Sequence, residues 1–330
     1  MARILSRYDV QRCLTMPEAI AAMRLAFSAL RTGQGTMPQR TVVNLPEQGT
    51  MLLMPSLLTT MEQHTFGLKL VAVVPRNPAR GLPLIHASVL LVDAATGKTL
   101  AIVEGGWLTA MRTGAVSGLA TELLARRDAD VLALFGAGTQ APLQVLAIHT
   151  VRPLREIRVV NRSIEHYEQL VITLRNLLGS DCPPIFRANS ASEALNGALL
   201  VACATTATDA LFSWQDVVPG THINAIGAFT PTMCEVDAET LAHARIVVDQ
   251  REAALSEAGD LLQPLAKGLI VGPATWVELS DVVTGRYPVR QHENDVTVFK
   301  SVGIAIQDVA VASMAYAKAL KLGIGVDIEV

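Results

Sequence analysis

The chain has 330 residues, of which 50% are hydrophobic and 17% are charged, and its formal net charge is −3. This length and composition predict a globular protein with a sizeable core divided between two domains. The near-neutral charge, the lack of a Lys/Arg-rich block and an aromatic content of only 4% argue against nucleic acid as a partner.

The sequence also gives no sign of a membrane protein. A membrane span needs about 20 consecutive apolar residues, and the apolar stretches of this chain are interrupted well before that length. Residues 1–10 lack the apolar centre of a signal peptide. The four cysteines form no C-x-x-C pair, which favours reduced thiols. We therefore expect a cytoplasmic protein that does not associate with membranes.

The first predicted element is an amphipathic helix. Thr15 and Glu18 form a capping box with Pro17 in the first turn, and apolar side chains then recur on one face. Gly33 is expected to end this helix. Residues 41–104 change to a period of two, which predicts antiparallel sheet. An alanine-rich helix is expected over residues 108–126.

Three cations stand out in this first part of the chain: Arg40 in MPQRT, Lys69 in FGLKLVAVV and Arg112 in TAMRTGA. Arginine and lysine are the usual side chains that hold a small carboxylate. Each also has a structural alternative, since Lys69 between Leu68 and Leu70 could lie on the solvent face of a half-buried strand. Spacing alone does not show that the three converge.

A strand that turns into a helix is the strongest motif of the chain. Residues 131–135 are all apolar and run into Gly136 and Gly138, and the predicted helix starts near Gln140. The third small residue is Ala141, which the G-x-G-x-x-G/A pattern permits. Such turns bring backbone N–H groups to a pyrophosphate, so we expect Gly136, Gly138, Thr139 and Gln140 to contact a dinucleotide.

The next predicted strand, residues 157–160, ends in Asn161, Arg162 and Ser163. NAD-binding folds usually place an acidic residue here for the ribose 2′-hydroxyl, whereas a guanidinium and a hydroxyl suit a 2′-phosphate. These three residues therefore predict NADPH as the cofactor, with NADH as an alternative. The structural alternative for Arg162 is a solvated loop position.

Further strands are expected near residues 184, 199, 222 and 245, alternating with helices, and a last long helix is expected over residues 302–321. This alternation predicts an α/β fold with a doubly wound parallel sheet of the Rossmann type. The last helix follows the nucleotide-binding part, so it could return to the first domain.

Other chemistries are not indicated. The seven histidines and four cysteines show no zinc-ligand spacing, so no metal site is expected, and no G-x-S-x-G motif marks a hydrolase. Asp308, Glu257 and Asp260 could approach a site, but helix caps and surface carboxylates are the more usual roles.

Taken together, the motifs resemble the ornithine cyclodeaminase/μ-crystallin family over nearly the whole chain. They occur in the family's order: MPQRT, GLKLV, GWLTAMRTGA, FGAGTQA, NRS, INAIGAF and FKSVGIAIQD. The resemblance implies a homodimer in which a Rossmann domain, residues 114–302, is inserted into a sheet-rich α+β substrate and dimerisation domain, residues 1–113 plus 303–330.

The resemblance also implies residue roles. Arg40, Lys69 and Arg112 match the residues that bind the substrate carboxylate. Thr113 and Ser301 match cofactor-contacting positions, and we assign Thr205 to the cofactor with them.

Two departures bear on the substrate. Phe229 stands where ornithine cyclodeaminase has a catalytic aspartate, and Leu52 stands where it has a glutamate for the side-chain amine. Cyclodeamination of a diamino acid is therefore disfavoured, and Phe229 and Leu52 would instead form an apolar wall for an uncharged ring. The NRS segment resembles the ketimine and Δ1-pyrroline-2-carboxylate reductase branch.

The predicted reaction is reduction of a small cyclic imine acid, Δ1-pyrroline-2-carboxylate or Δ1-piperideine-2-carboxylate, to proline or pipecolate. Lys69 and Arg112 are the expected catalytic residues; Lys69 either binds the carboxylate alone or also delivers a proton to the ring nitrogen. The alternatives are an alanine-type amino-acid dehydrogenase, an ornithine cyclodeaminase and a non-catalytic NADPH-dependent binding protein.

Overall fold

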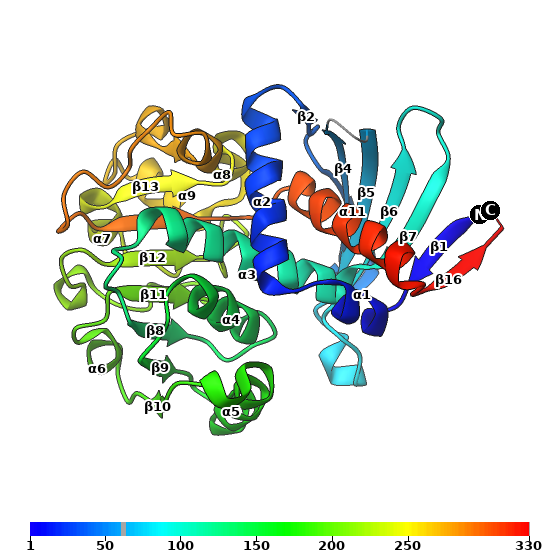
Figure 1. Ribbon diagram of the computed structural model, residues 1–330. Helices are drawn as coiled ribbons and strands as arrows, with labels where there is room; N and C mark the ends of the chain where they lie inside the picture. Colours follow the sequence, from blue (N-terminus) through cyan, green and yellow to red (C-terminus); the bar gives the residue numbers. More distant parts are fainter. Residues whose placement is uncertain (61–63, 330) are drawn as a thin grey trace. The chain divides into compact units, whose positions relative to one another are not determined.

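A computed structural model describes residues 1–60 and 64–329 of the chain (Figure 1). The chain divides into two compact units, one formed by Met1–Arg112 with Ile304–Val330 and the other by Thr113–Gly303. Each unit has its own sheet, and each is described by itself.

The first unit is built on an eight-stranded sheet with the order β16-β1-β7-β6-β5-β4-β2, in which β3 also pairs with β4. Its strands are β1 (Ala2–Leu5), β2 (Gly35–Thr36), β3 (Thr41–Asn44), β4 (Thr50–Thr59), β5 (His64–Val73), β6 (Ile85–Asp93), β7 (Thr99–Glu104) and β16 (Val326–Ile328). The predicted antiparallel region corresponds to β3 through β7. The edge strand β16 and its neighbour β1 were not predicted, and β1 pairs with β7 in parallel, so the sheet is mixed.

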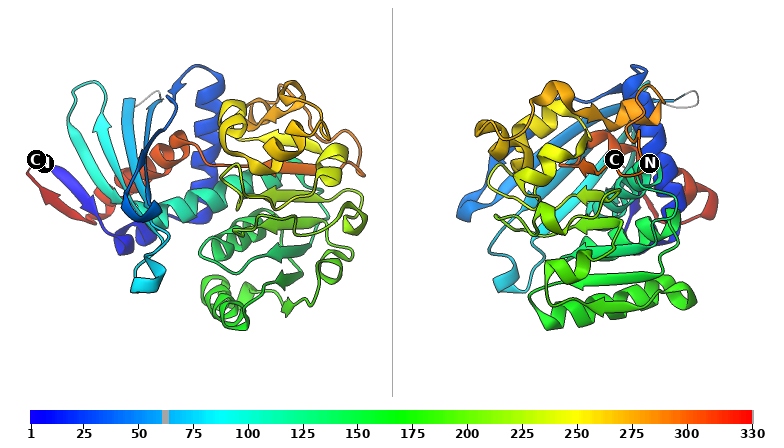
Figure 2. Two further views of the ribbon diagram at one scale, coloured as in Figure 1. Left: turned by 180° about the vertical axis from the view of Figure 1, so that it is seen from behind. Right: turned by 90° about the vertical axis from the view of Figure 1, so that its left-hand side faces the viewer.

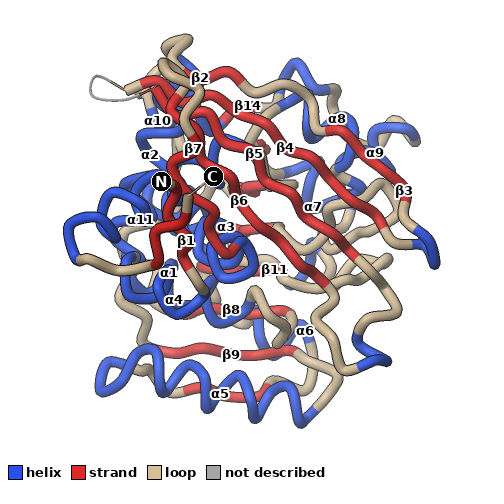
Figure 3. Tube along the Cα trace, turned by 90° about the vertical axis from the view of Figure 1, so that its right-hand side faces the viewer, coloured by secondary structure: helices blue, strands red, loops and turns tan. Residues whose placement is uncertain are grey.

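Helices cover one face of this sheet. They are α1 (Arg7–Cys13), α2 (Met16–Arg31) and α11 (Ala305–Leu322), and α3 (Gly105–Leu124) begins in this unit. Helix α11 packs on β4, β5 and β6, and α2 packs on α11. Gly67 of β5 permits this packing, because a Cβ atom there would collide with Val309 of α11. Figure 3 looks onto the opposite face, where the strands lie in front of the helices.

The second unit is a parallel sheet of eight strands with the order β10-β9-β8-β11-β12-β15-β13-β14. Its strands are β8 (Val131–Phe135), β9 (Glu156–Val160), β10 (Ile185–Arg187), β11 (Leu200–Cys203), β12 (His222–Ala225), β13 (Arg245–Val248), β14 (Val277–Glu278) and β15 (Thr297–Lys300). The chain moves outward from β8 to β9 and β10, then returns to β11 on the other side of β8. The topological switch point, where such sheets bind ligands, therefore lies between β8 and β11.

Helices cover both faces of this second sheet (Figures 1 and 2). They are α4 (Ala141–Val151), α5 (Ile164–Leu178), α6 (Ala191–Leu195), α7 (Ala238–His243), α8 (Arg251–Glu257), α9 (Gly259–Ala266) and α10 (Leu279–Val283). Side chains of strand β8 enter two cores: Leu132 and Leu134 belong to the core that includes residues of α4 and α5, while Ala133 and Phe135 belong to the core on the other face, where α6 contacts β8. This two-sided burial explains why β8 reads as a continuous apolar run.

The predicted α/β fold class is confirmed, and the differences lie at the level of elements. Strand β15 was not predicted, although it occupies a central place between β12 and β13. The alanine-rich helix α3 begins at Gly105, earlier than expected, because the Glu104 carboxylate accepts hydrogen bonds from the N–H groups of Gly106 and Trp107 and caps it.

Within the described ranges, no single helix is long and apolar enough to cross a membrane. Helices α1 and α2 together have the length and apolar composition of a membrane span, but the pair is bent by 86°. In the first unit α2 buries Met23 and Phe27 completely.

Candidate active site

Lys69 lies on the helix-covered face of the first unit's sheet. Along β5 the buried side is formed by Thr65, Gly67, Lys69 and Val71, whereas Leu70 on the other side is 39% exposed. The cross-strand neighbours of Lys69 are Met54 and Val89, both buried. Lys69 is only 2% exposed, so the solvent-face alternative for this residue is wrong.

Arg112 is a second buried cation of the same unit. It lies on α3 and is 7% exposed. Its Nε donates to Asp308 Oδ1 at 3.2 Å, and its Nη1 donates to Gln307 Oε1 at 2.8 Å. Among the described residues, its Nη2 has no hydrogen-bond partner.

Asp308 is the residue that joins the two cations. The sequence left it as a residue that could approach a site, with a helix cap or a surface position as the more usual role, and its burial excludes the surface position. It lies in the first turn of α11, is completely buried, and forms an ion pair at 2.8 Å with Lys69 Nζ in addition to its bond to Arg112. Its neighbour Gln307 is also fully buried, and the amide Nε2 of Gln307 has no partner in the described part of the chain. Sequence patterns carry little signal for either residue, because Arg112 and Asp308 are 196 positions apart.

The electrostatics of this cluster centre on Lys69. Burial lowers the pKa of Lys69 to about 8, an effect that Asp308 opposes and that the positive charges of Arg112 and Arg40 reinforce. Arg40, half-buried in the segment before β3, therefore acts on the same ammonium group as Arg112. Lys69 and Arg112 thus share the Asp308 carboxylate, and Arg40 is linked to them through the effect of its charge on Lys69.

The cluster has the chemistry of an anion site. Lys69 and Arg112 face one carboxylate, Asp308, which leaves a net positive charge before Arg40 is counted. Two N–H groups of Lys69, Nη2 of Arg112 and Nε2 of Gln307 are donors without a described partner, and these are the groups that a carboxylate accepts from. Leu52 on β4 packs with Met54, Val71 and Ala305 on this same face and adds an apolar surface.

The glycine turn of the second unit fits a pyrophosphate. Gly136 has a φ of +96°, and a Cβ atom there would lie 2.6 Å from Ala204 O, so only glycine fits. No atom lies within 4 Å of the position of a Cβ on Gly138, which leaves open space beside the turn. Thr139 is exposed, and Gln140 immediately precedes α4. Backbone N–H groups at this helix start are the expected partners of a phosphate.

The segment after β9 has mixed features for a 2′-phosphate. Arg162 is exposed and has no ion pair or hydrogen bond among the described residues, so its guanidinium group can bind an anion. Arg187, at the end of the adjacent β10, donates to Asn161 O at 3.5 Å and is a second cation that the sequence reasoning missed. Ser163 is already engaged, because it caps α5 through His166 N–H and donates to Glu165.

The other predicted cofactor contacts also belong to the second unit. Thr205 follows β11 and hydrogen-bonds to Glu235. Ser301 follows β15 and donates to Asp249 Oδ2 at 2.9 Å, and Thr113 accepts at its carbonyl from Gln144. Phe229, which was predicted to contact the substrate rather than the cofactor, also lies in this unit; it follows β12 and is 37% exposed. The roles of these residues stay predictions.

The comparisons with known proteins identify the family. The model of the ornithine cyclodeaminase/mu-crystallin family matches residues 2–322. The chain belongs to this family. Among its members, a Δ1-pyrroline-2-carboxylate reductase of Bacillus cereus is 37% identical, with 99% of each chain covered.

Two solved structures of the family are also similar. One is the Δ1-pyrroline-2-carboxylate reductase of Thermococcus litoralis in complex with NADH and L-proline, which is 35% identical with a TM-score of 0.93 and covers 99% of this chain and 100% of its own. The other is an archaeal alanine dehydrogenase dimer with bound NAD, which is 31% identical with a TM-score of 0.90 and covers 99% of each chain. The family resemblance seen in the sequence is confirmed.

Proposed function

We propose that this family member is an NAD(P)H-dependent oxidoreductase that reduces a small cyclic imine acid to the corresponding cyclic amino acid. Δ1-Pyrroline-2-carboxylate, which gives L-proline, is the first candidate, and Δ1-piperideine-2-carboxylate, which gives L-pipecolate, is the second. The observation that carries the proposal is the buried Lys69–Asp308–Arg112 cluster, in a chain similar over its full length to pyrroline-carboxylate reductases.

In this proposal the cation cluster binds the substrate through its carboxylate. Arg112 offers Nη2, Arg40 adds positive charge, and Gln307 offers an amide N–H. Asp308 keeps the guanidinium of Arg112 in a fixed orientation through Nε, so the carboxylate meets a preorganised donor.

Lys69 would act on the ring nitrogen. With a pKa of about 8 it is about nine-tenths protonated at pH 7 and can donate a hydrogen bond or a proton to the C=N nitrogen. A protonated imine is the better electrophile at C2, and the π electrons of C=N become the nitrogen lone pair when C2 is reduced. Overall, imine, reduced cofactor and one proton give amine and oxidised cofactor.

The second unit would hold the cofactor, with its pyrophosphate at Gly136, Gly138 and the start of α4. When bound, the cofactor supplies the hydride that is added to C2. We further propose NADPH in preference to NADH, because two cations, Arg162 and Arg187, lie at the ends of β9 and β10 where the 2′-phosphate is expected. The Thermococcus and archaeal structures contain NADH and NAD, so this preference needs its own test.

We also propose a homodimer formed through the sheet of the first unit. An apolar row crosses the face opposite Lys69, and strand register places its members side by side: Val326, Ile4, Ile102, Leu90, Leu68 and Pro55. Val326, Ile4 and Ile102 are 65%, 38% and 36% exposed. Exposed apolar surface of this kind is typical of an interface, and the archaeal relative is a dimer. Location in the cytoplasm stays a prediction.

An absorbance assay separates the candidate reactions. NADPH or NADH oxidation is followed with five- and six-membered cyclic imine acids, with pyruvate plus ammonia, and with ornithine. We expect turnover of a cyclic imine acid without ammonia. Turnover that requires pyruvate and ammonia together, with none on either imine, would instead indicate the alanine dehydrogenase alternative.

A further inference from the structure

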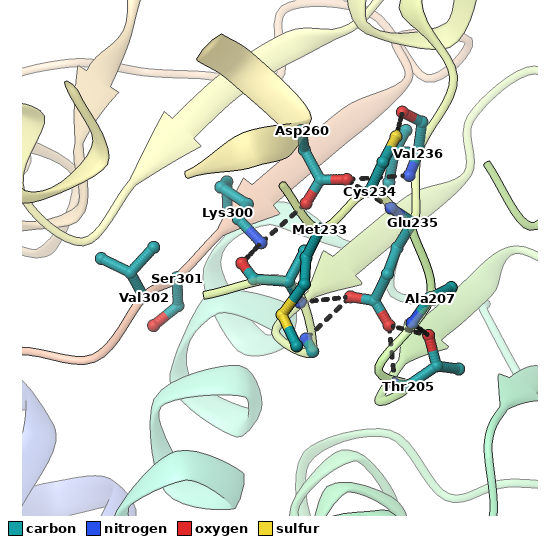
Figure 4. A network of polar contacts seen from close by, with 12 residues as sticks. Thr205, Ala207, Met233, Cys234, Glu235, Val236, Asp260, Lys300, Ser301 and Val302 are labelled. Carbon is teal, nitrogen blue, oxygen red and sulfur yellow. Dashed lines mark hydrogen bonds and ion pairs between the residues drawn. The ribbon is translucent and has the colours of Figure 1, made fainter. Parts of the chain in front are cut away.

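Three charged side chains are buried together in the second unit, and none of them belongs to the cation cluster described above (Figure 4). Glu235 precedes α7, Asp260 lies on α9 and Lys300 ends β15, and all three are completely buried. For Asp260 the sequence left open a place near a site, a helix cap or a surface position, and its complete burial excludes the surface position. The family resemblance assigned no role to any of them.

The carboxylate of Glu235 ties two loops together. Its Oε1 accepts from the backbone N–H and the hydroxyl of Thr205 at 2.7 and 2.8 Å, and its Oε2 accepts from the N–H groups of Gly227 and Ala228 at 2.7 and 3.0 Å. Thr205 follows β11, and Gly227 and Ala228 follow β12. A Cβ atom at Gly227 would collide with Thr205 O and with Glu235 itself, so the loops approach as closely as glycine allows.

Asp260 and Lys300 hold Glu235 in place from the other side. Asp260 Oδ1 accepts from the N–H groups of Glu235 and Val236, and its Oδ2 forms an ion pair with Lys300 Nζ at 2.7 Å. Lys300 in turn donates to Ala228 O. The contacts form a closed ring, in which each charged group fixes the backbone or side chain of the next.

Such a ring is not the arrangement that stability alone favours. Two carboxylates and one ammonium place an excess of negative charge in the interior, and burial raises the pKa of Glu235. Apolar residues of similar volume often stabilise a protein at least as well as buried ion pairs do. Cys234 beside the ring does not supply a nucleophile, because burial raises its pKa to about 12.

The tied loops lie at the cofactor end of the sheet. Ala204 O and the Thr205 side chain are the groups that a Cβ at Gly136 would meet, so the β11 loop lies directly against the glycine turn. The adenine ribose is expected at β9, on one side of the switch point between β8 and β11. The loops after β11 and β12 lie on the other side, where the nicotinamide half of a dinucleotide extends.

We propose that Glu235 is a positioning residue for the nicotinamide half of the cofactor. It sets the relative position of the loops at Thr205 and at Gly227–Ala228, and Asp260 and Lys300 keep its carboxylate aligned. This inference rests on the proposed function, since it needs a bound nicotinamide dinucleotide.

The test compares two ligands on the Glu235→Gln variant. The amide of glutamine presents an NH2 group to two of the four donors, so the loops must separate. NADPH should bind at least about tenfold more weakly, whereas adenosine 2′,5′-bisphosphate, which lacks the nicotinamide half, should keep its Kd within about twofold. Isothermal titration calorimetry measures both. Equal weakening of the two ligands, or no weakening of either, overturns the proposal.

Two further variants make the result decisive. Glu168→Gln, on the exposed side of α5, should bind both ligands like the wild type. If Glu235→Gln does not fold, Asp260→Asn gives the same comparison, because it keeps the acceptor for the N–H of Glu235 while Lys300 loses its ionic partner. A selective loss of NADPH affinity in this variant supports the proposal, and the absence of a selective loss overturns it. A wild-type protein that binds neither NADPH nor NADH would instead refute the proposed function.

Discussion

Asp308→Asn tests how a buried carboxylate controls the charge of Lys69. The substitution keeps an oxygen that accepts from Arg112 Nε but removes the negative charge 2.8 Å from Lys69 Nζ. At an effective dielectric constant of about 20, a pair at that distance interacts by about 6 kcal/mol. Even a quarter of that energy corresponds to about one pKa unit.

The direction of the shift follows from the two opposing causes. Burial lowers the pKa of Lys69 to about 8 while Asp308 raises it, so loss of the Asp308 charge lowers it further. If protonated Lys69 is needed, kcat/KM falls as pH rises through this pKa. The alkaline limb of the kcat/KM profile should therefore move to lower pH by at least about one unit in Asp308→Asn.

The assay is initial-rate measurement of cyclic imine reduction between pH 6 and 10. The imine itself titrates, so only the difference between wild type and variant is interpreted. Asp327→Asn is the matched control, since Asp327 also pairs with an arginine, Arg3, in the same unit but is exposed. Coincident profiles for Asp308→Asn and wild type, or an alkaline shift, would refute this reasoning.

Four other predictions follow from the same contacts. Arg162→Ala should weaken NADPH binding by about 1.5–3 kcal/mol and leave NADH nearly unchanged in a calorimetric titration; equal losses would exclude a 2′-phosphate role. Lys69→Met and Arg112→Met should each lower kcat/KM for the cyclic imine by about 100-fold or more while the Kd of NADPH stays the same, and near-normal turnover in both would remove them from the site. The pKa of Lys69 in the folded protein lies below its unfolded value of 10.5, so the unfolded chain binds more protons between pH 8 and 10.5. The free energy of unfolding, measured in urea, should therefore rise by about 3 kcal/mol across that range in the wild type relative to Lys69→Met. A difference between the two proteins that stays constant with pH would contradict the low pKa. Ile102→Asp, in the apolar row of the sheet, should give a monomer in light scattering, and a stable dimer would argue against this interface.

Local patterns were sufficient for much of the fold. The capping box at Thr15 and Glu18, the apolar run of β8 and the turn at Gly136 depend on neighbouring residues, and the structure has each of them. Strand β15 escaped prediction because it enters the sheet between β12 and β13 after a long excursion of the chain. Strands β1 and β16 are short, and their pairing makes them strands: β16 pairs with β1, and β1 also pairs with β7.

The site was harder to predict because it also depends on contacts between residues that are far apart in the sequence. Alternation along β5 showed that Lys69 and Leu70 lie on opposite faces, but it did not show which face α11 covers. The packing of Val309 against Gly67 decides this, and it also brings Asp308 to Lys69. A carboxylate on a distant helix is indistinguishable in sequence from a surface carboxylate until that packing is known.

Isotope transfer tests the central claim most directly. Δ1-Pyrroline-2-carboxylate is incubated with the enzyme and NADPH that carries two deuterium atoms at C4 of the nicotinamide, in ordinary water and without ammonia, and the proline is analysed by mass spectrometry and NMR. We predict L-proline with one deuterium at its α carbon. Unlabelled proline, or no proline from either deuterated NADPH or deuterated NADH, would contradict direct reduction of the imine carbon.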